Sequence, residues 1–375
     1  MLAYPMKKAL FLSIALLFSG LSALTAQTHW VNPLKLGDNI VHGRWWHSEL
    51  KDTYHRLPPR AEKAVRTSVW NLSHQSAGLS LVFHTNAPSI QVRYKVSGGL
   101  NMFHMPTTGV SGLDLYATDA NGALRWCASK FNLSFKDTIH YEFKDLTYFT
   151  GQDRGYDFEL FLPLYNEVTW MEVGVPEGYD VYFLPCTEEP PIVVYGTSIT
   201  QGACASRPGM AWTNIVHREM AYPVINLGFS GNALIEEAVF HYLSEIDARL
   251  FIIDCLPNMS TERSELIYPR LLRGVEILRE KSQAPILLVE HNYANGVSSQ
   301  QSVDWYTYSN AEQRRAFTDL TAKGVKGLHL LTHAELGFTQ DTMVEGIHPN
   351  DLGMRQYADA YLRKIHEILN TGHHE

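Results

Sequence analysis

A serine that follows a buried strand is the first candidate for chemistry in this sequence. The apolar residues Val193, Val194 and Tyr195 predict a strand, and Gly196 and Ser198 lie just beyond it. A serine hydroxyl is a weak nucleophile until a neighbouring base removes its proton, so Ser198 needs a partner elsewhere in the chain. Glycine and serine are also common turn residues at strand ends, and this segment alone does not define a site.

The candidate base lies far along the chain, immediately before the last predicted helix. His348 can take the proton of Ser198, and Glu345, three residues earlier, can accept a hydrogen bond from the other imidazole nitrogen. Such a bond fixes the tautomer and stabilises the imidazolium that forms during attack. Glu-x-x-His is a common pattern, and Asp341 or a backbone carbonyl are alternative acceptors for His348.

Acyl transfer also requires hydrogen-bond donors directed at the oxyanion that develops on the substrate. Gly231 follows the second strand of this half, and glycine permits backbone conformations that turn an N–H into a pocket. Asn258 follows the third strand, and its carboxamide can donate directly. Taken singly, the two residues are better explained as an ordinary loop glycine and a helix-capping asparagine.

The elements that position these residues alternate between strands and helices from Ile192 onward. We expect strands at 192–195, 224–227, 250–255, 286–290 and 328–331. We expect helices at 233–246, from 260 or 261 to about 281 with a kink or break at Pro269, at 311–323 and at 351–369. This alternation predicts a parallel sheet with helices on both faces, in which ligands bind beyond the carboxyl ends of the strands.

The first half of the chain has a different texture. Residues 27–185 contain short β-type runs separated by turns, such as 89–94, where Ile90, Val92 and Tyr94 alternate with polar residues. Many short strands of this kind predict an antiparallel β-sandwich with jelly-roll-like character. Residues 186–191 are polar, end in two prolines and are expected to be a linker to the α/β domain at 192–375.

Composition and the N-terminal residues indicate an exported protein. Lys7 and Lys8 precede an apolar run, so residues 1–26 are predicted to be a signal peptide; an uncleaved anchor is the alternative. Its removal leaves 29 basic and 39 acidic residues, a net charge of −10 that disfavours nucleic acid and anionic membranes. No later segment is apolar enough to span a membrane. We expect a periplasmic or secreted protein.

Cysteine usage gives little further information. Cys127, Cys186, Cys204 and Cys255 match no zinc-binding spacing, and their pairing is not fixed by the sequence. We expect free buried thiols or one disulfide bond, and neither a metal nor an organic cofactor.

The four segments together resemble the SGNH (GDSL-type) hydrolases, in which Ser, Gly, Asn and acid-x-x-His blocks follow in this order. The resemblance covers about residues 190–370 and implies a flavodoxin-like three-layer fold. It also implies that Ser198 attacks an ester carbonyl, that His348 moves the proton, and that Ser198 N–H, Gly231 N–H and Asn258 hold the oxyanion. Two positions depart from the family pattern: Thr197 replaces the usual aspartate before the serine, and Glu345 replaces the usual aspartate before the histidine.

The first half adds a second resemblance. Residues 109–116, with Gly112, Asp114, Leu115 and Tyr116, resemble the Gly-x-Asp-Leu-Tyr signature of a β-sandwich that precedes some bacterial SGNH esterases. A signal peptide, a sandwich and a hydrolase in this order resemble carbohydrate esterases. The resemblance implies a secreted serine esterase that forms an acyl-enzyme and removes O-acetyl groups from a poly- or oligosaccharide.

Other readings of the same residues remain open. A lipase, a thioesterase or a peptidoglycan O-acetyl esterase would use the same machinery, and an inactive glycan-binding protein is an alternative of another class. Possible substrate-pocket residues are Trp212, just after the nucleophile, and His291 and Asn292, after the fourth strand. All three are equally explained as structural residues.

Overall fold

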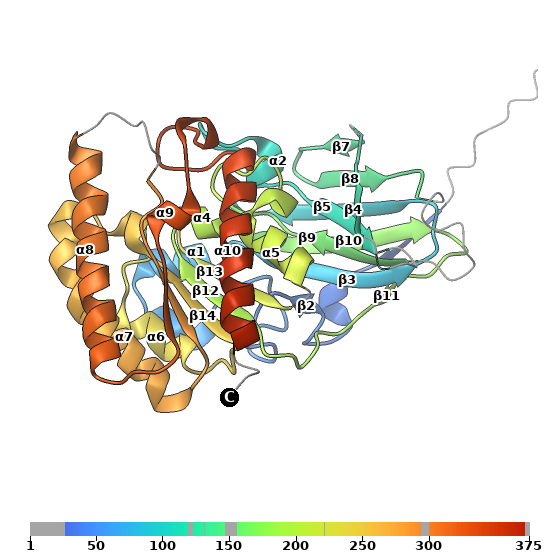
Figure 1. Cartoon of the computed structure of the whole chain (residues 1–375). Coiled ribbons are helices and arrows are strands. Elements are labelled where there is room, and N and C mark those ends of the chain that lie inside the picture. Colours follow the sequence, from blue (N-terminus) through green and yellow to red (C-terminus); the bar gives the residue numbers. More distant parts are fainter. Residues whose placement is uncertain are drawn as a thin grey trace, which may run out of the picture.

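The chain forms a β-sandwich beside a three-layer α/β domain (Figure 1). The computed structural model describes residues 27–118, 122, 124–130, 132–146, 156–220, 222–293 and 300–371, so the predicted signal peptide lies outside the described residues. The predicted combination of an antiparallel sandwich and a parallel α/β sheet is confirmed.

The sandwich consists of two antiparallel sheets. One has the order β1 (Thr28–Val31), β10 (Val168–Pro176), β4 (Ile90–Val96), β8 (Ile139–Phe143), β7 (Leu133–Ser134). The other has the order β11 (Tyr182–Phe183), β3 (Ser80–Thr85), β9 (Tyr156–Phe161), β5 (Asp114–Thr118), β6 (Leu124–Cys127), with β2 (Val41–His42) paired to β3. Alternate residues of β4 are fully buried between the sheets, as the sequence alternation predicts: Ile90, Val92 and Tyr94.

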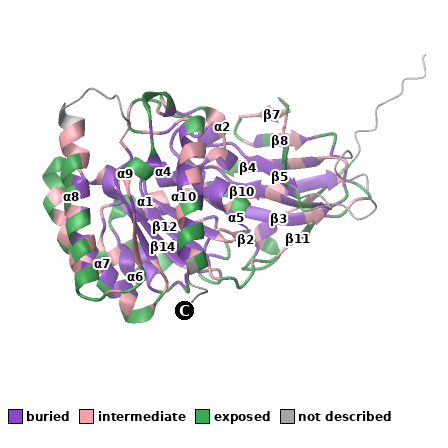
Figure 2. Cartoon of the chain, viewed as in Figure 1, coloured by how far each residue is buried: buried purple, intermediate pink, exposed green. Residues whose placement is uncertain are grey.

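The α/β domain contains a five-stranded parallel sheet. Its order is β13 (Val224–Gly228), β12 (Ile192–Gly196), β14 (Leu250–Asp254), β15 (Ile286–Val289), β16 (Leu328–Leu331). In chain order this is 2-1-3-4-5, the flavodoxin-like arrangement. Every residue of β12, β13, β14 and β15 is buried, because helices cover both faces of the sheet (Figure 2).

Helices cover the sheet in two layers. One layer has α5 (Trp212–Met220) and α10 (Asp351–Thr371); the other has α6 (Glu237–Leu243), α7 (Ile267–Lys281) and α8 (Gln300–Ala322). The predicted break at Pro269 is a 3-10 helix, η5 (Thr261–Leu266), that leads into α7. Pro269 lies in the first turn of α7, where a missing N–H is tolerated. The helix predicted at 233–246 is shorter, and the one predicted from 311 begins at Gln300.

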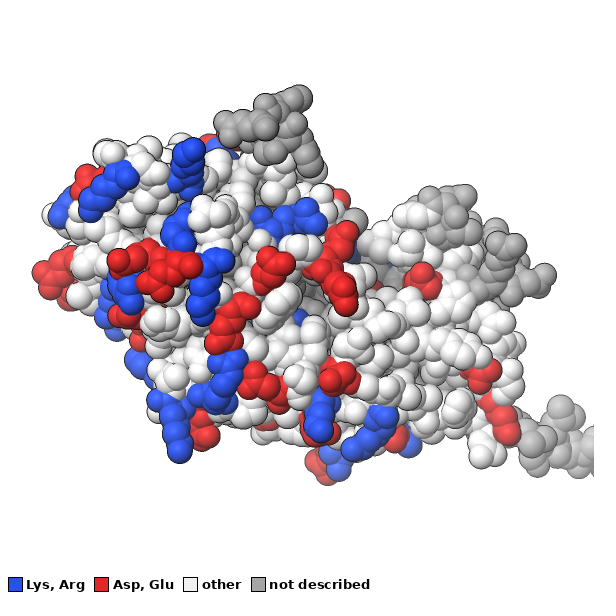
Figure 3. All heavy atoms as spheres, turned by 90° about the horizontal axis from the view of Figure 1, so that it is seen from below, with Lys and Arg blue, Asp and Glu red and all other residues white. Residues whose placement is uncertain are grey.

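Short helices complete the fold. They are α1 (Thr67–Ser73), α2 (Thr107–Val110), α4 (Ser198–Gln201), α9 (His333–Leu336), η1 (Pro33–Lys35), η2 (Pro59–Lys63), η3 (Pro208–Met210), η4 (Leu256–Asn258) and η6 (Gln340–Thr342). Within the described residues, no helix combines the length and the apolar character needed to cross a bilayer. On the face seen in Figure 3, basic and acidic side chains are interspersed.

The segment between β2 and β3 packs on the α/β domain, although it precedes most of the sandwich in sequence. Its apolar side chains share one core with α6 and α7; this core includes Trp46, Leu57, Val69, Phe240 and Leu271. The predicted boundary near residue 186 assigned this segment to the sandwich. Most of its apolar side chains pack on the other half of the molecule, whereas Tyr54 lies in the sandwich core and His55 contacts Glu167.

Arg56 fixes this segment to the parallel sheet. Its guanidinium is fully buried and donates to the carbonyl oxygens of Leu72, Gln75, Asn226 and Gly228 at 2.6, 2.7, 3.1 and 2.8 Å. Burial lowers the pKa of Arg56 to about 9, so the side chain remains charged at neutral pH. Removal of this cation would leave four buried carbonyls without their donors.

Candidate active site

Ser198 is the first residue of the short helix α4, directly after β12. The turn is tight because a Cβ on Gly196 would lie 2.0 Å from Thr200 Oγ1. Thr197 caps α4, and its hydroxyl oxygen accepts from the Ile199 N–H at 3.3 Å. Thr197, at the position of the usual aspartate, therefore supports the nucleophile loop. Ser198 is 7% exposed.

The structure brings Ser198, His348 and Glu345 together across 150 residues of sequence. Ser198 Oγ lies 2.8 Å from His348 Nε2, and His348 Nδ1 lies 2.5 Å from Glu345 Oε1. Because an ionised carboxylate only accepts hydrogen bonds, Nδ1 carries the proton and Nε2 is free to accept from the serine hydroxyl. This is the arrangement of a nucleophile, a general base and an orienting acid.

A sharp turn allows the longer glutamate to reach the imidazole. Gly346 has φ +93°, a conformation that favours glycine, and the Val344 N–H donates to the His348 carbonyl at 2.8 Å. The carboxylate of Glu345 is thereby folded back over the turn. Partial burial raises its pKa, but the hydrogen bond and charge of His348 outweigh this effect, and the pKa of Glu345 is lowered.

Asn258 and the loop that contains Gly231 lie at the ends of neighbouring strands. With its oxygen directed at this loop, the Asn258 carboxamide accepts from the backbone N–H groups of Asn232 and Ala233 at 2.9 Å each. Its NH2 group is then on the opposite side of the amide. The Ser230 N–H donates to Gln201 Oε1 at 3.0 Å, which holds the loop against α4. Gly231 has φ +68°, and its Cα faces open space.

The buried carboxyl group of Asp254 is hydrogen-bonded to α4 and α10, and no pattern in the sequence predicted a role for it. Asp254 Oδ2 accepts from Thr200 Oγ1 at 3.3 Å and from the Tyr357 hydroxyl at 2.9 Å. Burial raises the pKa of Asp254 to about 6. The only sequence signal for this residue was its position at the end of the third strand.

Of the three possible pocket residues, Trp212 needs correction. It has no exposed surface and stacks on Tyr361 with ring centroids 4.0 Å apart, so it is a core residue of the α5–α10 layer. His291 and Asn292 follow β15 as expected. Asn292 is only 1% exposed, whereas His291, at 6%, is about as exposed as Ser198, and its place in the pocket stays a prediction.

The Gly-x-Asp-Leu-Tyr segment attaches the sandwich to the region just after the nucleophile. Asp114 is 3% exposed and accepts from the Trp126 indole N–H at 2.6 Å, from the Gly209 N–H at 2.9 Å and from Arg207. Arg207 also donates to the Tyr116 hydroxyl at 2.7 Å. The motif therefore has a positioning role at the domain interface.

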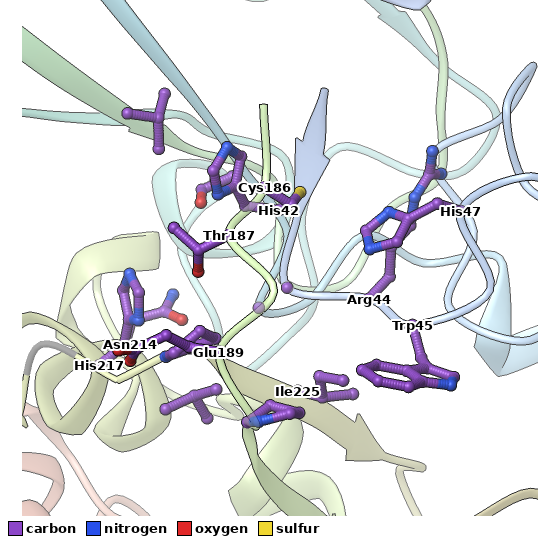
Figure 4. Close-up of a pocket in the computed structure, with 17 residues that line it drawn as sticks. His42, Arg44, Trp45, His47, Cys186, Thr187, Glu189, Asn214, His217 and Ile225 are labelled. Carbon is purple, nitrogen blue, oxygen red and sulfur yellow. The ribbon is translucent and has the colours of Figure 1, made fainter. Parts of the chain in front are cut away.

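A cavity of about 340 Å³ lies between the two halves at the amino ends of the strands, away from Ser198. Trp45, Arg44 and His47 line one side of it, and His42 and His217 line the other (Figure 4). Burial lowers the pKa of His47 to about 4, so this imidazole is neutral. The cavity holds none of the residues predicted to be catalytic.

Among the described residues, two groups of side chains have potential metal-ligand atoms within 4.8 Å of one another. They are His104, Cys204 and His348, and His55, His74 and Glu167. The first group includes the catalytic candidate His348, which is already hydrogen-bonded at both ring nitrogens. All four cysteines are free thiols.

The parallel sheet and the Ser198–His348–Glu345 geometry define a serine hydrolase of the flavodoxin-like α/β class. Residues 189–366 match the model of the GDSL-like lipase/acylhydrolase family, and residues 28–181 match the N-terminal domain of SGNH-hydrolase-type esterases. The chain therefore belongs to the GDSL-type (SGNH) hydrolases and carries the GxDLY domain in front of the hydrolase.

Solved structures share the whole two-part architecture. A GDSL-like lipase from Bacteroides ovatus is 29% identical, with a TM-score of 0.81 over 92% of this chain and 98% of that one. The salicylyl-acyltransferase SsfX3 of a tetracycline biosynthetic pathway is 18% identical, with a TM-score of 0.69 over 91% and 97%. A family two carbohydrate esterase from Cellvibrio japonicus is 12% identical, with a TM-score of 0.55 over 92% and 99%. No curated protein sequence matches the chain.

Proposed function

We propose that this hydrolase is an exported serine esterase that removes O-acetyl groups from carbohydrate. The observation that carries the proposal is the continuous chain of hydrogen bonds from Glu345 through His348 to Ser198. A serine needs such a series of hydrogen bonds to become a nucleophile. Two loops that are distant in sequence rarely bring these three residue types together for another reason.

The geometry supports an acyl-enzyme mechanism. His348 Nε2 takes the hydroxyl proton as Ser198 Oγ bonds to the ester carbonyl carbon, and the carbonyl oxygen becomes an oxyanion. The Ser198 and Gly231 N–H groups and the Asn258 NH2 hold this charge. The imidazolium then gives its proton to the leaving alcohol, and the C–O bond of the ester breaks. Water, activated by His348, releases acetate and restores Ser198.

Three features support carbohydrate as the alcohol. A carbohydrate esterase shares the architecture over nearly the whole chain. The side chains bonded in series to Ser198, those of His348 and Glu345, are polar, whereas a lipase binds an acyl chain in an apolar groove. Export, proposed from residues 1–26, would place the enzyme where glycans are found.

The test is a substrate panel assayed with the purified protein. We expect acetate release from acetylated xylan or xylo-oligosaccharides, and a kcat/KM for p-nitrophenyl octanoate at least a hundred times lower than for p-nitrophenyl acetate. A preference for the octanoyl ester would indicate a lipase. Binding of deacetylated glycan without hydrolysis of any ester would indicate an inactive binding protein.

Export is tested separately by the N-terminus of the native protein. We expect mass spectrometry of the periplasmic or secreted fraction to find a chain that begins near Gln27. Recovery of the full-length chain in the membrane fraction would favour an uncleaved anchor instead.

A further inference from the structure

A tight turn of the sandwich carries a fully exposed aromatic ring beside the catalytic histidine. Met102 and Met105 exchange backbone hydrogen bonds at 3.3 and 3.2 Å, so Phe103 and His104 occupy the tip of the turn. Phe103 is 97% exposed. Because apolar surface is more stable when buried, a ring held fully in water is suited to an external contact.

The other tip residue fixes the turn against the active site. The ring centroids of His104 and His348 are 5.5 Å apart, and those of Phe103 and His104 are 4.2 Å apart. The Cys204 thiol donates to the His104 carbonyl at 3.5 Å. The Thr108 hydroxyl, three residues after the turn, donates to the Ser206 carbonyl in the loop that follows α4, at 2.7 Å. These contacts place Phe103 one aromatic ring away from His348, although it belongs to the sandwich.

The chemistry of the triad determines which half of an ester lies beside this turn. His348 must protonate the departing alkoxide, so the alcohol oxygen lies next to His348 Nε2. The carbonyl oxygen lies instead toward the donors Gly231 and Asn258. The group attached to the alcohol oxygen therefore extends from the His348 side of the site, where His104 and Phe103 are.

A polar cleft begins at the same turn. Its volume is about 320 Å³, and it is lined by Met102 and by side chains that carry amide, imidazole and carboxylate groups: Asn71, His74, Gln75, Asn101 and Glu167. Tyr165, also in its wall, donates to the Ser198 carbonyl at 3.2 Å, so the cleft adjoins the nucleophile loop. Within the described structure, His74 Nε2 is buried without a hydrogen-bond partner.

We propose that the Met102–Met105 turn and this cleft bind the alcohol half of the ester, with a sugar ring stacked on Phe103 and its hydroxyl groups directed at the cleft. The inference rests on the proposed function and assigns carbohydrate recognition to the sandwich. Aromatic rings offer sugar C–H faces an apolar surface, while amide and carboxylate groups satisfy hydroxyls, so one flat ring beside a polar cleft fits this class of ligand.

The test is Phe103→Ala assayed on two acetyl esters that differ only in the alcohol, an acetylated xylo-oligosaccharide and ethyl acetate. We expect kcat/KM to fall about 10- to 30-fold on the oligosaccharide, mostly through KM, and this loss to be at least fivefold larger than any loss on ethyl acetate. Phe103→Trp should restore activity on the oligosaccharide. Tyr182→Ala removes another exposed aromatic ring of the sandwich, in β11, and should leave both substrates within twofold of wild type.

Equal losses on the two esters, or no loss on the oligosaccharide, would overturn the inference and leave the esterase function intact. Wild-type protein that cleaves ethyl acetate but no acetylated carbohydrate would instead contradict the proposed function. A direct measurement uses Ser198→Ala and deacetylated xylo-oligosaccharide in isothermal titration calorimetry. We expect the additional change Phe103→Ala to weaken binding about tenfold, and unchanged affinity would also reject the role of Phe103.

Discussion

The two edges of the parallel sheet both carry histidines, yet only one is organised for chemistry. At the carboxyl edge, His348 lies between a hydroxyl and a carboxylate from different loops. At the amino edge, a larger set of histidines and Arg44 surrounds a cavity between the two halves of the molecule. The candidate active site is therefore identified by a hydroxyl, an imidazole and a carboxylate that meet in space, and not by the presence of a cavity.

Several polar groups of the amino edge have structural partners, although Arg44 Nε and His47 Nδ1 are buried without one in the described structure. Arg44 donates to the Thr53 carbonyl at 2.5 Å, and His42 Nε2 lies 2.9 Å from the Leu184 carbonyl. His217 is paired with Glu159 at 3.0 Å. The pair of His217 and Glu159 joins α5 to β9 of the sandwich, so this edge helps to hold the two halves together. The carboxyl edge keeps a nucleophile partly exposed and paired only with its base.

The largest expected effect tests this distinction directly. Ser198→Ala removes the nucleophile and should lower kcat for a small acetyl ester by about four to six orders of magnitude. His47→Gln changes the amino edge, where no role in the reaction is assigned, and should leave kcat within twofold of wild type. Steady-state assays on p-nitrophenyl acetate measure both. Retained activity in Ser198→Ala would show that the carboxyl edge is not the catalytic one.

The orienting acid is the next test. Glu345→Gln keeps the shape of the side chain but offers an NH2 group to His348 Nδ1, which favours the wrong tautomer. We expect kcat to fall by about three orders of magnitude. Asp341→Asn, at the alternative acceptor, is the matched control and should stay near wild type. Similar losses of kcat in the two variants would show that Glu345 does not orient His348.

Replacement of Asn258 should lower kcat less than replacement of a triad residue. Asn258→Ala removes one donor to the oxyanion and should lower kcat by about two to three orders of magnitude with little change in KM. We expect kcat to change more than KM because this hydrogen bond strengthens in the transition state. A loss below tenfold would exclude Asn258 from the oxyanion hole.

The two edges should also respond to pH in opposite directions. Asp254, with a pKa near 6, binds protons more tightly in the folded than in the unfolded state. The free energy of unfolding should therefore decrease as pH rises from 4 to above 6, by about 2–3 kcal/mol. His47, with a pKa near 4, binds protons less tightly when folded, so the free energy of unfolding should decrease as pH falls below 6.5. Its partial exposure limits this loss to about 1 kcal/mol.

Urea unfolding at pH 5, 7 and 8 separates these contributions. Asp254→Asn should reduce the change in the free energy of unfolding between pH 5 and 8. His47→Leu should reduce the change in the same quantity between pH 7 and 5. His366→Gln, on the exposed face of α10, is the control for a histidine without this burial. Identical pH profiles for wild type and Asp254→Asn would show that the buried carboxyl does not titrate as the structure implies.

Patterns local in sequence predicted much of this molecule. Continuous apolar runs such as Ile286–Val289 identified all five parallel strands. The family order of Ser198, Gly231, Asn258 and His348 predicted a site at the carboxyl edge, where the structure brings Ser198 and His348 within hydrogen-bond distance. The bounds of α6 and α8 were less accurate, because helix ends depend on packing and capping as much as on periodicity. The sequence also left open whether Glu345 could reach His348, since that depends on the conformation of Gly346.

The missing information concerned contacts between distant segments. Nothing in the sequence near Phe103 indicates a catalytic histidine 245 residues away; the turn is recognised only when His104 is seen against His348. Similarly, Trp212 looked like a pocket residue because it follows the nucleophile, but the packing of α10 buries it. Long-range packing of this kind leaves no local periodic signal.

Arg56 has a consequence for how the protein folds and how it can be divided. Its four carbonyl acceptors belong to the segment around α1 and to β13, so neither half completes its interior alone. We expect the two halves to unfold in a single cooperative transition, and residues 192–375 produced alone to aggregate. The hydrolase is therefore not a module that recombination can transfer by itself: the segment between β2 and β3 must be inherited with it.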